Sequence, residues 1–146
     1  MKGALLRTFQ DVLVGYLILV VVGSAGCGPN SDGSKMKEVE ALQTSIPVFP
    51  FQVETREDRV SKGIVASICK YYKSDASYTE VQKFYVKELT ALGWQYDGDR
   101  ELKDWGTDLG GLQIEFRDRE YQFHIQYAGD KAGYAWNYAA TVSWRK

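Results

Sequence analysis

The chain has 146 residues, with 18 lysines and arginines against 19 aspartates and glutamates and a formal net charge of −1. This balance offers no basic excess that would attract nucleic acid, and the single histidine excludes a histidine-rich metal site. The length supports one domain with a modest core.

The first 26 residues have the features of a secretory signal. Lys2 and Arg7 precede an uncharged run, Val12–Val22, that is shorter than the roughly 20 apolar residues needed to span the hydrocarbon core of a bilayer. Small residues follow the run up to Gly26, as they do at a processing site. Residues 1–26 are therefore predicted to be a signal peptide and do not enter the fold prediction.

A cysteine directly follows this segment. The sequence from Ser24 to Cys27, Ser-Ala-Gly-Cys, resembles the lipobox of bacterial lipoproteins, in which a signal peptidase cuts before a cysteine whose sulfur receives a diacylglycerol. Ala25 and Gly26 match that pattern, whereas Ser24 stands where the lipobox usually has Leu or another aliphatic residue. The resemblance implies lipidation at Cys27, with acyl chains such as palmitate, and anchoring to a membrane of the bacterial cell envelope, facing the periplasm or the exterior. An ordinary signal peptide, or a short uncleaved anchor with an incidental cysteine, is the alternative.

The residues after Cys27 predict a tether and then a folded domain. Gly28–Thr44 is rich in Gly, Ser and charge, so residues 27–45 are assigned to the lipidated cysteine and a flexible tether, and residues 46–146 to the domain. Ile46–Val53 contains two prolines, which favour an extended run against the domain edge. An exposed docking peptide is the other interpretation of that run.

One strand and one helix follow. Gly63–Lys73 is rich in β-branched and aromatic residues and predicts a strand. Ser77 with Glu80 three residues later forms a capping box, and the apolar residues behind it recur at helical spacing until Gly93 ends the helix.

Beyond Trp94 the apolar residues alternate with polar ones, as in strands with one buried face. A short strand over residues 94–97, a turn at Gly98, a return over 100–105 and a glycine-rich loop over 106–111 are predicted before three alternating strands. The latter are expected over residues 112–117, 121–127 and 134–144. The predicted fold is α+β, in the order β-α-β-β-β with one further strand left open, an antiparallel sheet covered on its apolar face by one long helix.

The segment Ser74–Trp94, together with the upstream IPVFP, resembles a pattern found in small, mostly uncharacterised bacterial lipoproteins. Its parts are a Pro-x-x-Pro lead-in, Val-x-x-Phe-Tyr and Leu-x-x-x-Gly-Trp, and the resemblance extends over residues 46–144. It implies an envelope location and a compact α+β domain, and it supplies no catalytic residues.

Few residues suggest chemistry. His124 lies on the polar side of its strand, and Cys69 is interpreted as a small buried hydrophobic residue. Acidic residues cluster between Asp97 and Asp108, where a charged, solvated loop is the simplest interpretation and a hydrolase or a weak divalent-cation site is the alternative. No catalytic residue, metal site or cofactor is predicted.

The aromatic residues are unusually numerous, at 14% of the chain with ten tyrosines. Six of these aromatic side chains cannot all point into the core. A surplus of exposed Tyr and Trp is common on recognition surfaces. Packing in the core or at the sheet edge is the alternative for each. The residues of this possible recognition surface are Tyr71, Tyr72, Tyr78, Tyr134, Trp136 and Tyr138.

The sequence thus predicts a non-enzymatic, lipid-anchored envelope protein that contacts the membrane through its anchor and recognises another envelope component, a protein. Two alternatives stay open: a lipoprotein that binds a small apolar ligand between helix and sheet, and a hydrolase that uses the acidic residues 97–108.

Overall fold

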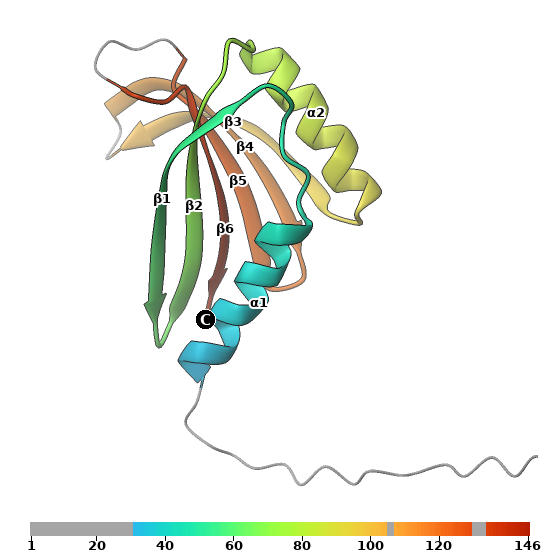
Figure 1. Ribbon diagram of the computed structural model, residues 1–146, viewed down its shortest axis with the longest axis vertical. Coiled ribbons are helices and arrows are strands. Elements are labelled where there is room, and N and C mark those ends of the chain that lie inside the picture. The colour runs from blue at the N-terminus through green and yellow to red at the C-terminus, as the bar shows by residue number, and fades with distance from the viewer. Residues whose placement is uncertain (1–30, 105–106, 130–133) are drawn as a thin grey trace, which may run out of the picture.

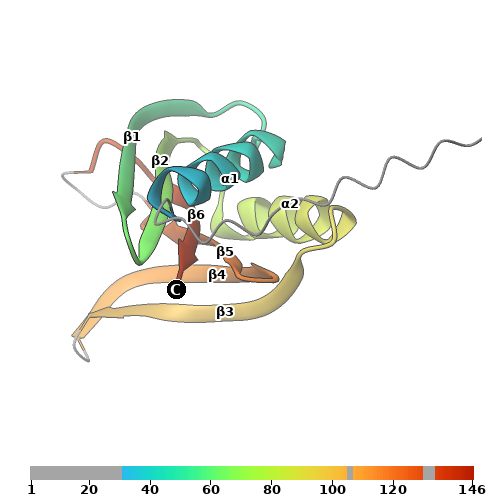
Figure 2. The same cartoon turned by 90° about the horizontal axis from the view of Figure 1, so that it is seen from below.

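A computed structural model describes residues 31–104, 107–129 and 134–146, and it places two helices on one face of a six-stranded antiparallel sheet (Figure 1). The strand order across the sheet is β1-β2-β6-β5-β4-β3. Seen from below, the sheet curves around the two helices (Figure 2). In chain order the elements are α1 (Ser31–Ser45), β1 (Val53–Lys62), β2 (Val65–Lys73), α2 (Tyr78–Ala91), β3 (Gln95–Asp104), β4 (Thr107–Asp118), β5 (Tyr121–Tyr127) and β6 (Tyr138–Arg145).

The α+β class and the antiparallel sheet are confirmed, but the single long helix and the β-α-β-β-β order are wrong. Two helices of 15 and 14 residues cover the sheet, and the described elements follow the order α-β-β-α-β-β-β-β. Neither helix in the described part of the chain is long and apolar enough to cross a bilayer.

Helix α2 forms where its capping box predicts it. The Ser77 hydroxyl accepts from the backbone N–H of Glu80, and the Glu80 carboxylate accepts from the backbone N–H of Ser77 at 2.8 Å. At the other end Gly93 adopts a φ of +91°, so that the N–H of Trp94 reaches the carbonyl of Leu89 at 3.0 Å. The chain therefore turns sharply into β3, with the Trp94 side chain buried.

Helix α1 corrects the predicted tether. Residues 31–45 are helical, and Val39 is fully buried in the same core as α2 and the sheet. The described domain therefore includes residues 31–45, which were predicted to be a tether, whereas the signal peptide 1–26 and Cys27 lie outside the described residues. Met36 and Leu42 pack against the core on either side of Val39, and this tertiary contact stabilises a helix too weak to be recognised from its own sequence.

The strands at the two sheet edges differ from the predictions. The polar segment Val53–Lys62 forms β1, which was not predicted, and nearly all of it is exposed. Residues 95–104 form one continuous strand, because Gly98, at a φ of +115°, makes a bulge where a turn was expected. Residues 107–111, which belong to the glycine-rich segment predicted as a loop, form the beginning of β4.

The sheet has two unlike faces. Ala66, Ile68 and Tyr72 of β2 are buried beneath the helices, together with the inward residues of β4, β5 and β6. The intervening β2 residues point to the opposite side, which no helix in the described residues covers. We call this side the open face. Its residues include Val65, Ser67, Cys69 and Tyr71 of β2, His124 of β5, and Thr141 and Ser143 of β6.

Candidate recognition surface

Three of the predicted surface aromatic residues meet on the open face. The rings of Tyr71 and Trp136 lie edge to face with centroids 5.3 Å apart, and the ring of Tyr134 lies 5.0 Å from that of Trp136. The guanidinium of Arg56 stands 3.9 Å from the centre of the Tyr71 ring, within range of a cation–π interaction. We call Tyr71, Tyr134, Trp136 and Arg56 the aromatic cluster.

The other three residues lie elsewhere. Tyr72 and Tyr138 are 3% and 0% exposed beneath the helices, with ring centroids 5.2 Å apart, so the core accounts for both. Tyr78 begins α2 and packs edge to face against Tyr127. The predicted six-residue surface therefore reduces to its three members in the aromatic cluster.

A buried asparagine, absent from the sequence prediction, holds the cluster together. Asn137 is 2% exposed; its N–H donates to the carbonyl of Tyr72 at 2.8 Å, and its side-chain oxygen accepts from the N–H of Ser74 at 2.8 Å. These bonds fix the chain next to Trp136 against the end of β2. The alternation of residues 134–144 gave no signal for this role, because Asn137 occupies an ordinary polar position in that predicted strand.

Burial raises the pKa of Tyr71 to about 12. Its hydroxyl therefore keeps its proton at neutral pH and adds no negative charge beside Arg56. Tyr134 is 53% exposed, so the cluster presents aromatic surface to solvent while its inner members are held by their neighbours. Such a rigid, half-buried aromatic group is typical of protein-recognition surfaces.

Further along the open face lies a shallow hollow of about 530 Å³ lined mainly by uncharged polar side chains. His124 lies in its wall between β4 and β6, as the polar side of its strand predicts. Burial lowers the pKa of His124, so the imidazole is neutral at pH 7. Other side chains lining the hollow are Ser67, Gln122, Thr141 and Ser143.

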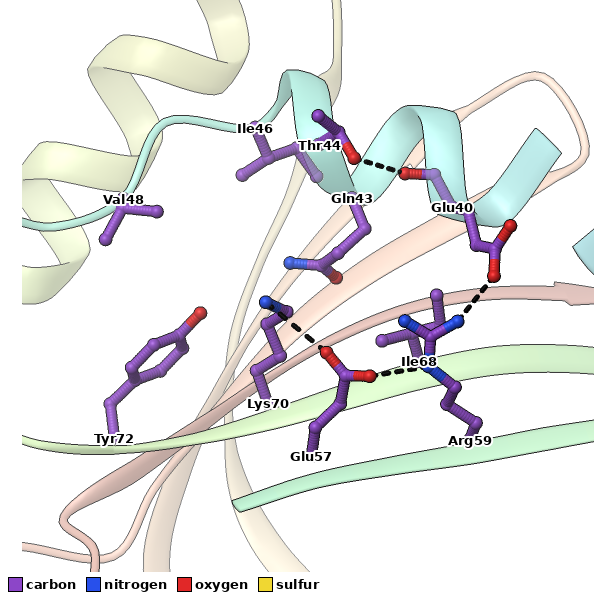
Figure 3. A pocket seen from close by; sticks show the side chains of 10 residues that line it. All are labelled: Glu40, Gln43, Thr44, Ile46, Val48, Glu57, Arg59, Ile68, Lys70 and Tyr72. Carbon is purple, nitrogen blue, oxygen red and sulfur yellow. Dashed lines mark hydrogen bonds and ion pairs between the residues drawn. The ribbon is translucent and has the colours of Figure 1, made fainter. Parts of the chain in front are cut away.

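A second hollow, of about 470 Å³, lies between α1 and the β1–β2 hairpin (Figure 3). Ile46, Val48, Ile68 and the ring of Tyr72 make its apolar side. Gln43 projects into it from α1, and the buried Oε1 of Gln43 has no hydrogen-bond partner among the described residues. We call this space the α1 pocket.

The charged rim of the α1 pocket is paired within itself. Lys70 lies 3.0 Å from Glu54 and 3.4 Å from Glu57, and Arg59 bridges Glu57 at 2.5 Å and Glu40. Burial disfavours the Lys70 ammonium, but the hydrogen bond to Glu54 and the pairing with Glu57 outweigh it and raise the pKa of Lys70. The hydrogen bond from Arg59 is the main cause of the lowered pKa of Glu57. These groups are therefore paired with one another before any ligand arrives.

The acidic residues between Asp97 and Asp108 lie along β3 and the start of β4. Asp97 pairs with Arg117 at 3.0 Å, and Asp99 accepts hydrogen bonds from Tyr96 and Gln82. The side chains of Asp104 and Asp108 lie outside the described residues. Among the side chains that the structure does describe, no group of three or more His, Cys, Asp or Glu residues is arranged to hold a metal ion.

Only one of the two cysteines, Cys69, lies within the described residues. Cys69 is a free thiol, partly buried on the open face, so the prediction of a buried small residue is only partly met. Cys27 lies outside the described residues.

Comparison of the chain with protein-family models, with curated proteins and with solved structures gave no match. The function is therefore inferred from the geometry of the aromatic cluster and of the α1 pocket.

Proposed function

We propose that this chain is a lipid-anchored, non-enzymatic protein of the bacterial cell envelope whose domain recognises another envelope protein through the aromatic cluster. The supporting observation is the partly exposed group of aromatic rings of Tyr71, Trp136 and Tyr134, which lies beside Arg56 on a sheet face that no described helix covers. Tyr, Trp and Arg are the residue types most enriched among those that dominate binding energy at protein interfaces.

The sheet edges favour recognition by the face rather than by addition of a strand. β1, at one edge, carries exposed charged residues such as Arg56, Asp58 and Arg59. β3, at the other edge, contains the Gly98 bulge, which shifts its register against β4. Both devices discourage pairing with a further strand.

Cross-linking in cells tests the recognition surface. A photoreactive phenylalanine analogue in place of Tyr134 should give a discrete adduct with one envelope protein, and Trp136→Ala should abolish that adduct because it removes the ring on which residue 134 packs. The matched control carries the analogue at Lys83, on the exposed side of α2. Identical products from both positions, or an adduct that persists in the Trp136→Ala background, would contradict the proposal.

The anchor is supported by the lipobox resemblance at Ser24–Cys27 and is tested separately. The intact mass of protein from the membrane fraction should lack residues 1–26 and include acyl chains, and the Cys27→Ala variant should lack that added mass. An unmodified wild-type mass would remove lipidation from the proposal.

A second candidate, binding of a small ligand, is favoured by one observation: the buried, unpartnered Oε1 of Gln43 faces the α1 pocket. Since the charged rim is already paired, the suitable ligand is neutral, with an apolar body for Ile46 and Ile68 and one hydrogen-bond donor for Gln43.

Three six-carbon probes separate this candidate from non-specific binding. In calorimetry, 1-hexanol should bind more tightly than hexanoate or hexylamine, and Gln43→Leu should remove the preference, whereas Gln122→Leu on the open face should not. Equal affinity for the three probes, or no binding of 1-hexanol, would exclude this ligand class.

A further inference from the structure

One end of the domain gathers segments that are far apart in the sequence. The β1–β2 hairpin lies beside the end of β6, because the N–H of Lys146 donates to the carbonyl of Ile64 at 3.1 Å and Arg145 pairs in register with Val65. The first turns of α1 reach the same end, the lower end in Figure 1, where the helix begins near the tip of the hairpin.

A side-chain network ties α1 to this end. Lys35 lies 2.6 Å from Glu120, at the β4–β5 turn, and 5.5 Å from the centre of the Trp144 ring on β6. We call this part of the molecule the α1 end. The aromatic cluster lies at the other end of β2: Val65 begins that strand and Tyr71 is six residues along it, a distance of about 20 Å at strand rise.

Each acidic side chain named at the α1 end has an ion-pair partner there, although one lysine is shared by two carboxylates. Glu38 and Glu120 both pair with Lys35, and Asp118 pairs with Arg119 at 3.2 Å. Hydrogen bonds from Tyr121 and Lys35 lower the pKa of Glu38, and those from Lys35 and Trp144 lower the pKa of Glu120. These carboxylates are therefore already engaged with partners of the same end.

The remaining basic side chains of this end are exposed and have no ion pair within the described part of the chain. Even with the one negative charge that Glu38 and Glu120 carry beyond that of Lys35 counted against them, an excess of positive charge remains. These residues are Lys37, Lys62, Arg145 and Lys146. The chain as a whole carries a net charge of −1, so this excess reflects where the charges lie.

An apolar side chain stands among these cations. Ile64, at the tip of the β1–β2 hairpin, is 66% exposed. It lies two residues from Lys62, and its carbonyl is bonded to Lys146. An exposed aliphatic side chain at a basic tip can enter the headgroup region of a bilayer while the cations contact lipid phosphates.

We infer that the α1 end binds the surface of a bilayer containing anionic phospholipids. Each basic side chain held near such a surface adds roughly 1 kcal/mol of attraction, which corresponds to about a fivefold gain in affinity. The contact goes beyond the proposed anchor and does not depend on it, because it uses side chains of the folded domain. It orients the domain with the aromatic cluster directed away from the lipid.

Vesicle co-sedimentation tests this surface. The protein is the chain from residue 27 with Cys27→Ala, which has neither the apolar segment Val12–Val22 nor an acyl chain; all contacts described above lie within residues 31–146, so it contains the whole described domain. It should bind phosphatidylcholine vesicles that contain 30% phosphatidylglycerol, release them in 0.5 M NaCl, and ignore vesicles of phosphatidylcholine alone.

Two double variants, each lacking two positive charges, show whether binding depends on where the charges lie or only on the total charge. Lys62→Gln with Arg145→Gln should weaken binding about 25-fold, at about fivefold per charge. Lys83→Gln with Lys87→Gln, which removes the same charge from α2, should change it less than about twofold. Ile64→Ser should weaken binding at low salt without changing how steeply binding falls as salt is added, because it removes apolar contact instead of charge.

Equal binding to both kinds of vesicle, or equal losses in the two double variants, would overturn the inference. No binding by the parent protein would overturn it as well. Because this protein carries no lipid, such a failure would leave the proposed acylation of Cys27 standing. Conversely, an unmodified Cys27 in cells would leave the bilayer contact of the α1 end standing.

Discussion

Among individual residues, the adjacent pair Tyr71 and Tyr72 shows what a sequence can and cannot specify. Neighbouring strand residues must face opposite sides of a sheet, so one of the two had to be buried. Which one depends on the register with β1 and β6, and the helices cover the Tyr72 side. The recognition surface was predicted by residue type alone, and three of its six residues remained after this register was known.

The position of His124 was easier to predict. In β5 the apolar residues Tyr121, Phe123 and Ile125 are buried and the polar residues between them face away from the core, as their alternation indicates. The burial of His124 itself could not be predicted, because it arises from β4 and β6 lying on either side of β5.

The burial of His124 predicts how the free energy of unfolding depends on pH. The folded-state pKa of His124 lies below the ordinary value of about 6.5, chiefly through burial; Glu115 opposes the shift and Arg100 adds to it. Well above pH 6.5 the imidazole is neutral in both the folded and the unfolded state, so it adds no pH dependence there. As the pH falls below 6.5 the unfolded chain takes up the proton first, so the free energy of unfolding should decrease.

Denaturant titrations between pH 7 and pH 5 measure this loss. His124→Gln should lose less stability than the parent over that interval, since Gln does not titrate. Parallel pH profiles for the two proteins would show that burial of His124 does not depress its pKa.

Among the elements, helix α2 and strand β1 mark the two extremes of predictability. α2 carries its own signals, a capping box at one end and Gly93 at the other, and both form as the sequence indicates. β1 has almost no sequence signals of its own. Because it is an edge strand and exposed over nearly its whole length, its residues do not alternate between apolar and polar types as those of a half-buried strand do. Residues 53–62 are a strand because they pair with β2.

The cap of α2 gives a prediction at this scale. Ser77→Ala removes the hydroxyl that accepts from the Glu80 N–H, and it should lower the free energy of unfolding by about 1 kcal/mol. Ser77→Asp, which preserves an acceptor, should restore most of that loss. Chemical denaturation of the three proteins measures their free energies of unfolding. Equal stability of the parent and Ser77→Ala would mean that the cap contributes nothing to the stability of the domain.

At the scale of the whole molecule, the position of α1 decides where the domain begins. Its apolar residues occur in a segment that starts with Gly, Ser and charged residues, so nothing in the residue pattern separates this helix from a tether. Val39 packs into the core that α1 shares with α2 and the sheet, because the curved face of the sheet accommodates both helices.

Truncation tests this boundary. A chain beginning at residue 46 loses the fully buried Val39 and the packing of Met36 and Leu42, so its free energy of unfolding should fall by about 3 kcal/mol or more. A chain beginning at residue 31 should match the longer protein. If the shorter chain were as stable as the longer one, α1 would not be part of the cooperative domain.

The strand order also determines when folding can finish. β6 is the last strand in the chain, yet it lies between β2 and β5 near the middle of the sheet. Until β6 has emerged, the β1–β2 hairpin has nothing to pair with on its inner side, and α1 lacks part of the surface on which it rests. Contacts between the beginning and the end of a chain form late, because a long loop must close first. The complete sheet is therefore expected to form only when nearly the whole chain is present.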